Sequence, residues 1–318
     1  MSFKCGGDAD ADTPRLDIIS AFVAVQEQTR GCTKLLFIAA CFSNLCYGKR
    51  NLILQNDNWG DRARIGMFIV GSEAVPEAEW WAMLPSGISV HAARITAATP
   101  WATWREDRKS VLLSDDLTRG ATQFASMRLS AVVIGHSSSS FVGGKGWDAA
   151  ALNALSEVVG PDIPVTTNGL DTMAALNALG VKRPFLVLPP WFNDVTVAAG
   201  VRYLEDHELA PAGYLSYDPG ANWRDVLPSE MYPRGLGFVQ EIEPLHDQIL
   251  ASCPTYADSV LIAGTGFRCV AILESLEEAL GRPVISANQS SLWHCLNLAG
   301  VHTVISGYGN LLRNQSGN

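Results

Sequence analysis

From residue 62 onward, short apolar runs alternate with longer segments whose apolar residues recur at helical spacing. The runs predict buried strands over 64–70, 88–94, 131–134, 163–166, 185–188, 213–217, 259–262 and 284–286. The segments between them predict helices over 76–84, 107–127, 146–158, 170–179, 194–205, 238–252, 268–280 and 290–298. Strands joined by helices of this length form right-handed βαβ units, so the pattern predicts an α/β protein with mostly parallel sheets.

An internal repeat divides these elements into two rounds. The segment 164–168 returns as 283–288, and the offset of 120 residues holds at Asn168/Asn288, Asn177/Asn297, Gly180/Gly300 and Val181/Val301. We therefore predict two pseudo-symmetric, doubly wound lobes with mostly parallel four-stranded sheets and an active site in the cleft between them. The predicted boundaries assign 58–181 and 300–318 to the first lobe and 182–299 to the second.

Two glycine-containing turns follow equivalent strands. Gly135-His136-Ser137-Ser138 follows the strand 131–134, and Gly264-Thr265-Gly266 follows the strand 259–262. Ligands of open α/β sheets bind beyond the carboxyl ends of strands, and backbone N–H groups at the start of a helix attract anions. The two turns therefore predict a pocket for a small anion.

Residues 1–57 differ from the rest of the chain and form a predicted N-terminal extension that is partly helical and partly disordered. Residues 1–13 are polar and rich in Gly and Asp, whereas 17–28 and 33–47 fit helices. The segment contains four of the seven cysteines: Cys5, Cys32, Cys41 and Cys46. Without a CxxC pair or a histidine partner, buried structural thiols are favoured over a zinc site.

Composition limits the function classes. The chain has 318 residues, of which 47% are hydrophobic and 17% charged, as in a soluble globular protein. Its net charge of −9 argues against binding nucleic acid. The apolar run 35–41 is too short to span a bilayer, and no signal peptide is recognisable. The odd, irregularly spaced cysteines indicate a reducing compartment, so we predict a cytoplasmic protein, and we expect a homo-oligomer.

Several segments resemble the aspartate/glutamate racemase superfamily, and within it the maleate cis–trans isomerases and arylmalonate decarboxylases. The resemblance covers roughly residues 62–312, and its segments are 63–66, 83–85, 89–94, 140–144, 175–181, 283–289 and 293–300. It implies two pseudo-symmetric α/β lobes with the active site in the cleft between them. It implies no metal or organic cofactor.

That superfamily does its chemistry with cysteines in these two turns, or with a single cysteine in the decarboxylases. In this chain the first cysteine position corresponds to His136, or to Ser137 if the gap in the alignment is moved by one residue. The second cysteine position corresponds to Gly264. Cys269 lies one helical turn further on, where we expect it to pack. Racemisation by two thiols is therefore excluded, while a small carboxylate or carbonyl substrate remains the expectation.

Three residues are candidates for catalysis in place of the cysteines. His136 can act as general base or acid near neutral pH if it keeps an ordinary pKa, although it can also be a structural histidine. Glu73 can orient His136 or share its proton, or it can be a solvated carboxylate at a helix start. Ser137 is a possible nucleophile, although adjacent residues on a tight turn rarely point at each other.

The candidate substrate-binding residues come from four turns. Ser137, Ser138 and Thr265 supply hydroxyl groups for an anion, and Arg268 can pair with a carboxylate or form a structural ion pair. The predicted binding set is Ser72, Ser137, Ser138, Pro190, Trp191, Gly264, Thr265, Gly266 and Arg268.

These observations predict a cofactor-independent enzyme that acts on a small carboxylate or cyclic carbonyl compound. The expected reaction is general acid/base proton transfer of the lyase or isomerase type. One alternative is a hydrolase that opens a small ring, with His136 activating water. Another alternative is a catalytically inactive protein that binds a small acid.

Overall fold

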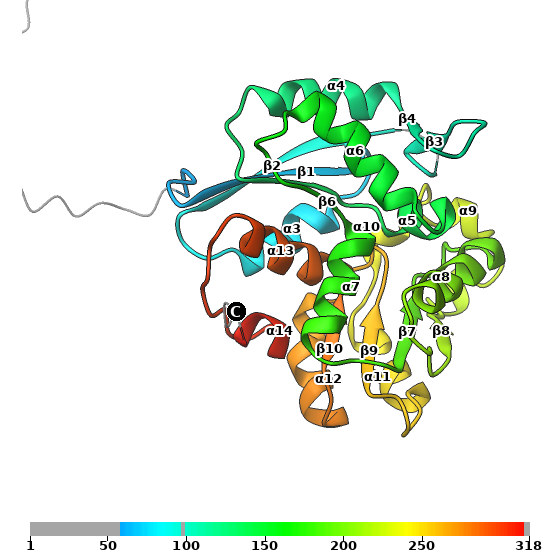
Figure 1. The fold of residues 1–318 in the computed structure, drawn as a ribbon. Helices are drawn as coiled ribbons and strands as arrows, with labels where there is room; N and C mark the ends of the chain where they lie inside the picture. Colours follow the sequence, from blue (N-terminus) through cyan, green and yellow to red (C-terminus); the bar gives the residue numbers. More distant parts are fainter. Residues whose placement is uncertain (1–57, 97–98, 315–318) are drawn as a thin grey trace, which may run out of the picture. The chain divides into compact units, whose positions relative to one another are not determined.

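Two four-stranded parallel sheets form the framework of the protein (Figure 1). The computed structural model describes residues 58–96 and 99–314, so the prediction for the extension 1–57 lies outside it. The first sheet has the order β2-β1-β5-β6, and its strands are β1 (Ala63–Val70), β2 (Ile88–Ile95), β5 (Ala131–Ile134) and β6 (Val165–Thr167). The second has the order β10-β9-β7-β8, and its strands are β7 (Pro184–Leu188), β8 (Tyr214–Ser216), β9 (Ser259–Ile262) and β10 (Val284–Ser286).

Both sheets have the same topology. If the strands of each sheet are numbered in chain order, their spatial order from one edge of the sheet to the other is second, first, third, fourth. Every neighbouring pair within the two sheets is parallel. The prediction of an α/β fold with two pseudo-symmetric lobes is confirmed.

The helices cover the faces of these sheets. The α-helices are α3 (Val75–Met83), α4 (Asp115–Ala125), α5 (Ser137–Gly143), α6 (Trp147–Val159), α7 (Asn168–Ala178), α8 (Asp194–Asp206), α9 (Pro228–Met231), α10 (Leu236–Val239), α11 (Glu243–Ser252), α12 (Leu273–Leu280), α13 (Ala287–Leu298) and α14 (Asn310–Arg313). Short 3₁₀ helices span Ala221–Trp223 and Val270–Ile272.

Some predicted helices are shorter than expected. The helix predicted over 107–127 is wrong in its first half, where β3 (Ala102–Trp104) and β4 (Val111–Leu113) pair as an antiparallel hairpin. α4 begins only after Ser114, whose hydroxyl oxygen accepts a hydrogen bond from the N–H of Leu117 at 3.3 Å. Likewise, α11 begins at Glu243 and α12 at Leu273, and α5 was not predicted.

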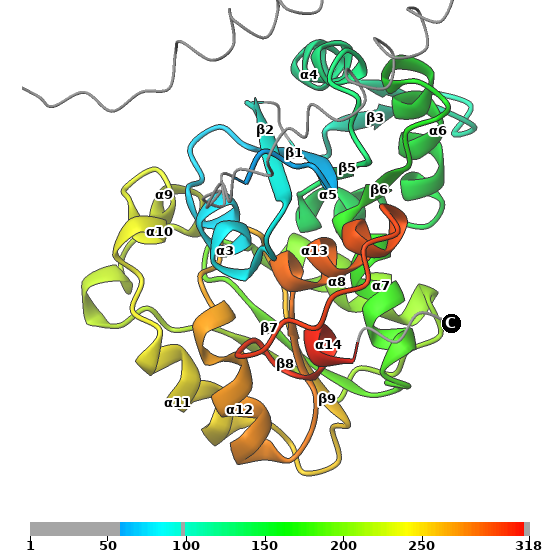
Figure 2. The ribbon, with the colours of Figure 1, turned by 90° about the vertical axis from the view of Figure 1, so that its left-hand side faces the viewer.

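The two lobes share one hydrophobic core. This cluster contains Ile65 of β1 and Trp80 of α3 together with Val187 of β7, Ile262 of β9 and Leu292 of α13. α7 and α13, the helices of the repeated segments, pack side by side (Figures 1 and 2). The predicted lobe boundaries at 181/182 and 299/300 stay a prediction, because residues 56–318 group as one unit.

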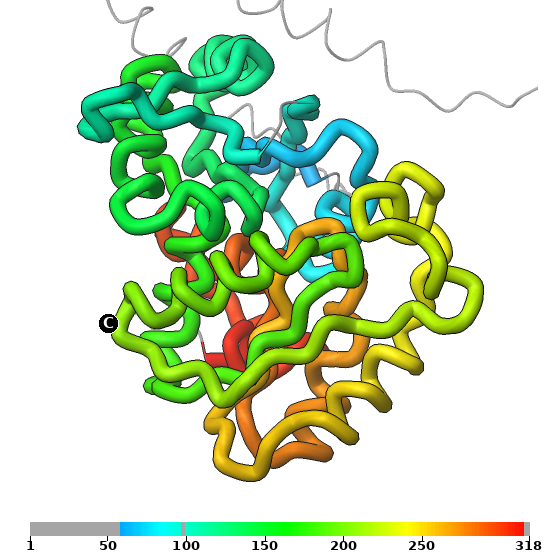
Figure 3. The backbone as a smooth tube through the Cα atoms, turned by 90° about the vertical axis from the view of Figure 1, so that its right-hand side faces the viewer, coloured from blue at the N-terminus to red at the C-terminus, as the bar shows by residue number. Residues whose placement is uncertain are grey.

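The segment between β8 and α11 carries α9 and α10 and lies beside α3 (Figures 2 and 3). It follows a strand of the second sheet but packs next to a helix of the first. This segment therefore brings side chains of the second lobe to the edge of the first, at the place where the turn after β1 begins.

Candidate active site

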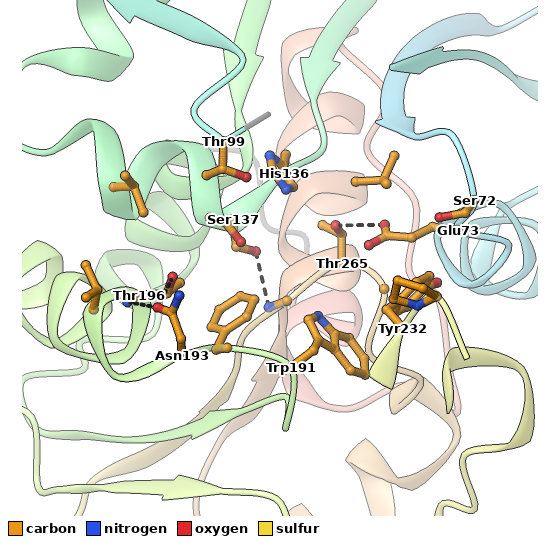
Figure 4. Close-up of a pocket in the computed structure, with 18 residues that line it drawn as sticks. Ser72, Glu73, Thr99, His136, Ser137, Trp191, Asn193, Thr196, Tyr232 and Thr265 are labelled. Atoms are coloured by element: carbon orange, nitrogen blue, oxygen red, sulfur yellow. Dashed lines mark hydrogen bonds between the residues drawn. The ribbon is translucent and has the colours of Figure 1, made fainter. Parts of the chain in front are cut away.

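The turns after β5 and β9 contact each other directly. The N–H of Gly264 donates to the hydroxyl of Ser137 at 3.2 Å, and the hydroxyl of Thr265 donates to the carbonyl of Gly135 at 3.1 Å. Both turns also line one pocket of about 540 Å³ (Figure 4). The prediction that the two turns face each other is confirmed.

This pocket brings together the three residues predicted to be catalytic and most of those predicted to bind substrate. They are Ser72, Glu73, His136, Ser137, Ser138, Trp191, Gly264, Thr265 and Gly266. Two predicted residues do not line it. Arg268 is exposed, and its backbone N–H and carbonyl are both hydrogen-bonded to the side chain of Gln240. Pro190 is buried beneath the turn that presents Trp191.

Glu73 lies at the start of α3 and is only 7% exposed. The one side-chain partner of its carboxyl group among the described residues is the hydroxyl of Thr265, 3.5 Å from Oε2, and this hydroxyl donates its single proton at shorter range to the carbonyl of Gly135. Arg94 donates to the backbone carbonyl of Glu73 and pairs with Glu77, and its charge lowers the pKa of Glu73 by less than burial raises it. Burial raises the pKa of Glu73 to about 8. Glu73 therefore holds a proton at neutral pH, and the alternative of a solvated helix-start carboxylate is wrong.

His136 has a different environment from the one expected. Its ring stacks on Trp101 with a centroid separation of 4.3 Å, and Nδ1 lies 2.8 Å from the hydroxyl of Ser139. Burial lowers the pKa of His136 to about 4, so the expectation of an ordinary histidine pKa is wrong. The imidazole is neutral at pH 7 and can offer a ligand a hydrogen bond but no charge.

Ser137 connects the two turns. Its hydroxyl donates to Oδ1 of Asn168 at 2.5 Å while accepting the N–H of Gly264. His136 bonds instead to Ser139. Ser137 and His136 therefore do not form the hydrogen bond that a serine nucleophile needs. Ser137 instead holds the two turns of the pocket together.

The two repeated asparagines hold the turns in place, a role that the sequence analysis missed. Nδ2 of Asn168 donates to the carbonyl of Ala287 at 2.8 Å and to the hydroxyl of Ser291 at 2.9 Å. Nδ2 of Asn288 donates to the carbonyl of Thr265 at 2.9 Å and to the carboxylate of Glu79 at 2.7 Å. Their recurrence in the repeat was the signal that could have revealed this role.

Glycine is required twice in the second turn. Gly264 has φ +97°, and a Cβ atom there would lie 2.9 Å from Cγ of Pro189. A Cβ atom on Gly266 would lie 2.4 Å from Oε1 of Glu73. The turn thus has no room for a side chain at the position where the resembling enzymes carry a cysteine. Within the ranges that the structure describes, the N–H groups of Thr265 and Gly266 have no acceptor, so they are available to a ligand.

An aromatic wall closes the side of the pocket opposite the first turn. Trp191 packs edge-on against Tyr232, with centroids 5.0 Å apart (Figure 4). Tyr232 comes from the segment between β8 and α11, and its buried hydroxyl has no partner among the described residues. Nothing in the local sequence marked Tyr232 as part of the site.

Thiols lie outside this pocket. Of the cysteines in the described part of the chain, Cys269 and Cys295 are buried and Cys253 is partly buried, and burial raises the pKa of all three. Across residues 58–96 and 99–314, no cluster of His, Cys, Asp and Glu is arranged to hold a metal ion. The helices in the same ranges include none long and apolar enough to cross a membrane.

The fold and the site define a two-lobed α/β protein with a small-molecule pocket between two parallel sheets. Residues 109–312 match the family model for arylmalonate decarboxylase, and the chain belongs to that family. A curated relative, the arylmalonate decarboxylase of Bordetella bronchiseptica, is 25% identical over 168 residues. That match covers 51% of this chain and 61% of the relative, less than two thirds of its length.

Solved structures share the fold. The maleate isomerase Iso from Pseudomonas putida S16 matches with a TM-score of 0.65 and 18% identity, over 80% of this chain and 99% of its own. A maleate cis–trans isomerase from Nocardia farcinica matches with a TM-score of 0.64 and 19% identity, over 79% and 98%. A crystal structure of arylmalonate decarboxylase gives 0.59 and 22%, over 78% and 98%. These structures show the shared fold, and the family match over residues 109–312 confirms the resemblance noted in the sequence.

Proposed function

We propose that this protein is a cofactor-independent enzyme of the lyase or isomerase type, with Glu73 as its proton donor. The observation that carries the proposal is a buried carboxyl group with a pKa raised to about 8 at the wall of the inter-lobe pocket. A general acid works best when its pKa lies near the operating pH. Glu73 meets this condition, while His136 stays neutral.

The pocket has neutral donors suited to a carboxylate. The N–H groups of Thr265 and Gly266 have no protein acceptor in the described ranges, and the hydroxyl of Ser138 lines the pocket without a partner there. Fixed donors of this kind stabilise a developing oxyanion in a site of low polarity. The family name and the maleate isomerase neighbours support a small carboxylic acid as substrate.

The proposed chemistry proceeds through an enediolate. Loss of CO₂ from a malonate-type acid breaks a C–C bond and leaves its electron pair on the α-carbon, delocalised into the remaining carboxylate. The donors of Thr265 and Gly266 hold the resulting oxyanion, and neutral His136 can add a hydrogen bond. The protonated carboxyl of Glu73 then transfers its proton to the carbon, and the Glu73 carboxylate regains a proton from water.

The two alternatives have less support. A ring-opening hydrolase needs His136 as a base, but burial makes this imidazole less basic than an ordinary histidine. An inactive acid-binding protein needs no carboxyl group with a pKa near neutrality beside its anion donors. A cytoplasmic homo-oligomer remains part of the proposal.

The test is a turnover assay on arylmalonates, maleate and small cyclic amides with wild-type protein and Glu73→Gln. We expect Glu73→Gln to lower kcat by about 10²–10⁴-fold with little change in KM, and wild-type kcat to fall above about pH 8. Glu278→Gln, on the exposed face of α12, is the matched control and should retain full activity. A normal kcat in Glu73→Gln would refute the role of Glu73.

A further inference from the structure

A second cavity adjoins the candidate active site. Its volume is about 620 Å³, and residues of α5, α8 and the loop after α5 line it. Val142 and Val195 line both this cavity and the active-site pocket. These two valines, 38% and 73% exposed, therefore form a common boundary over which a ligand can extend from one cavity to the other.

The floor of the second cavity is apolar. Phe141 and Tyr203 are buried there, and Ala198 and Ala199 add small side chains along α8. Together with the two shared valines they make a continuous apolar surface that leads away from Glu73. Such a surface suits the hydrocarbon body of a ligand.

Three cations surround this floor. Arg108, Lys145 and Arg202 line the cavity, and none of them forms an ion pair with a carboxylate in the described part of the chain. Asp194 and Asp206 also line it, so three cations face two carboxylates. This local excess of positive charge contrasts with the net charge of −9 of the whole protein.

The hairpin β3–β4 brings one of these cations to its place. Nε1 of Trp104 donates to the carbonyl of Gly143 at 2.9 Å, which fastens the hairpin to the end of α5. The guanidinium of Arg108 lies over the Trp104 ring, 5.2 Å from its centroid. By contrast, neither Lys nor Arg lines the active-site pocket. A charged group at the far end of a substrate therefore finds cationic partners in the second cavity and none in the first.

We propose that the substrate is an elongated acid with a second carboxylate, which binds in the second cavity near Arg108, Lys145 and Arg202. Its reacting carboxylate lies in the active-site pocket, and its apolar body crosses Val142 and Val195. The placement of the reacting carboxylate in the active-site pocket rests on the function proposed above. The second cavity and its charged residues are observed independently of that function.

The test compares two series of probe ligands by calorimetry: straight-chain dicarboxylates from adipate to dodecanedioate, and monocarboxylates of the same lengths. Beyond a threshold length, we expect a dicarboxylate to bind wild-type protein about tenfold more tightly than its matched monocarboxylate, because charge-assisted bonds form at the second end. The advantage should shrink as salt is added.

Variants locate the effect. In the double variant Lys145→Gln/Arg202→Gln the advantage should fall to about twofold or less. Ala198→Trp, which fills the floor, should abolish it while leaving the binding of monocarboxylates too short to reach the second cavity unchanged. The control Lys182→Gln/Arg183→Gln removes two exposed cations before β7, and it should keep the advantage.

Three results would overturn the inference: equal affinities of the two series at every length, an advantage that persists in Lys145→Gln/Arg202→Gln, or an advantage independent of length. Glu73→Gln separates this inference from the proposed function, because it should lose turnover yet keep the dicarboxylate advantage. If wild-type protein shows no dicarboxylate advantage but its turnover still depends on Glu73, the proposed binding in the second cavity is refuted and the proposed function is not.

Discussion

Glu73, just before α3, and Glu79, in the middle of α3, are two acidic residues that differ in their partners. Both are nearly buried, with exposures of 7% and 5%, and burial raises the pKa of both. Glu79 accepts hydrogen bonds from the N–H groups of Cys269 at 2.6 Å and Val270 at 3.0 Å and from Asn288 at 2.7 Å. Glu73 has one partner among the described residues, the hydroxyl of Thr265 at 3.5 Å, and it lines the pocket.

This difference shows that burial alone does not identify a functional carboxyl group. Glu79 uses its acceptors to fix the backbone after β9, and through Asn288 it helps to hold the carbonyl of Thr265. Glu73 keeps most of its hydrogen-bonding capacity free and faces the pocket. Glu79 therefore maintains the second turn, and Glu73 is the group available to a substrate.

The sharpest test of the comparison replaces each of the two carboxyl groups by an amide. Glu73→Gln should lose about 10²–10⁴-fold in kcat without a fall in its melting temperature. Glu79→Gln should lose about 1–3 kcal/mol of stability, because its amide N–H groups would face donors, and it should keep most of its kcat at low temperature. Calorimetric melting and steady-state rates on both variants check this. Equal loss of stability in the two would remove the distinction.

The pH dependence of stability separates Glu73 from His136. The folded protein keeps the Glu73 proton up to about pH 8, whereas the unfolded chain releases it near 4.5. This contribution is therefore lost as pH rises between those values, at about 1.4 kcal/mol per pH unit. For His136 the sign is opposite: its pKa is about 4 when folded and 6.5 when unfolded, so stability is lost as pH falls between 6.5 and 4.

Denaturant unfolding from pH 4 to 9 measures both contributions as differences from wild type. Glu73→Gln should gain relative stability toward pH 8, and His136→Asn should gain it toward pH 4. Variants whose curves stay parallel to that of the wild type would show that neither group is buried as the structure places it.

The second turn can be perturbed at two glycines with different consequences. Gly264→Ala forces a side chain to φ +97° beside Pro189 and should cost about 1–3 kcal/mol of stability. Gly266→Ala leaves the backbone unstrained but displaces the carboxyl group of Glu73. Its main effect should therefore be a lower kcat, with little change in melting temperature. Melting temperatures and kcat of both variants check this, and identical profiles would contradict the separate roles of the two glycines.

The smallest effect is expected from thiol reagents. Cys269 and Cys295 are buried, and no cysteine of the described residues lines the pocket. Brief treatment with iodoacetamide should change kcat less than about twofold, since raised pKa values keep these thiols protonated. Rapid inactivation that persists in Cys269→Ser would place a reactive thiol at the site.

Much of the architecture can be predicted from the chain alone. The strands 131–134, 259–262 and 284–286 were predicted with the bounds that the structure has, because short, mainly apolar runs between turn residues have few other solutions. The repeat around Asn168 and Asn288 indicated two equivalent lobes. Since ligands of open α/β sheets bind beyond the carboxyl ends of strands, the turns at Gly135 and Gly264, one from each sheet, could be assigned to the site.

The chemistry of the site depends on contacts between distant parts of the chain. The pKa values of Glu73 and His136 follow from burial, which no local pattern reports. The hydrogen bond of Ser137 to Asn168, the place of Tyr232 and the exposure of Arg268 arise from the packing of segments that are distant in the chain. The chain alone thus indicates where the turns lie, whereas tertiary packing decides which side chains carry a proton, because desolvation and hydrogen-bond partners come from elements far apart in sequence.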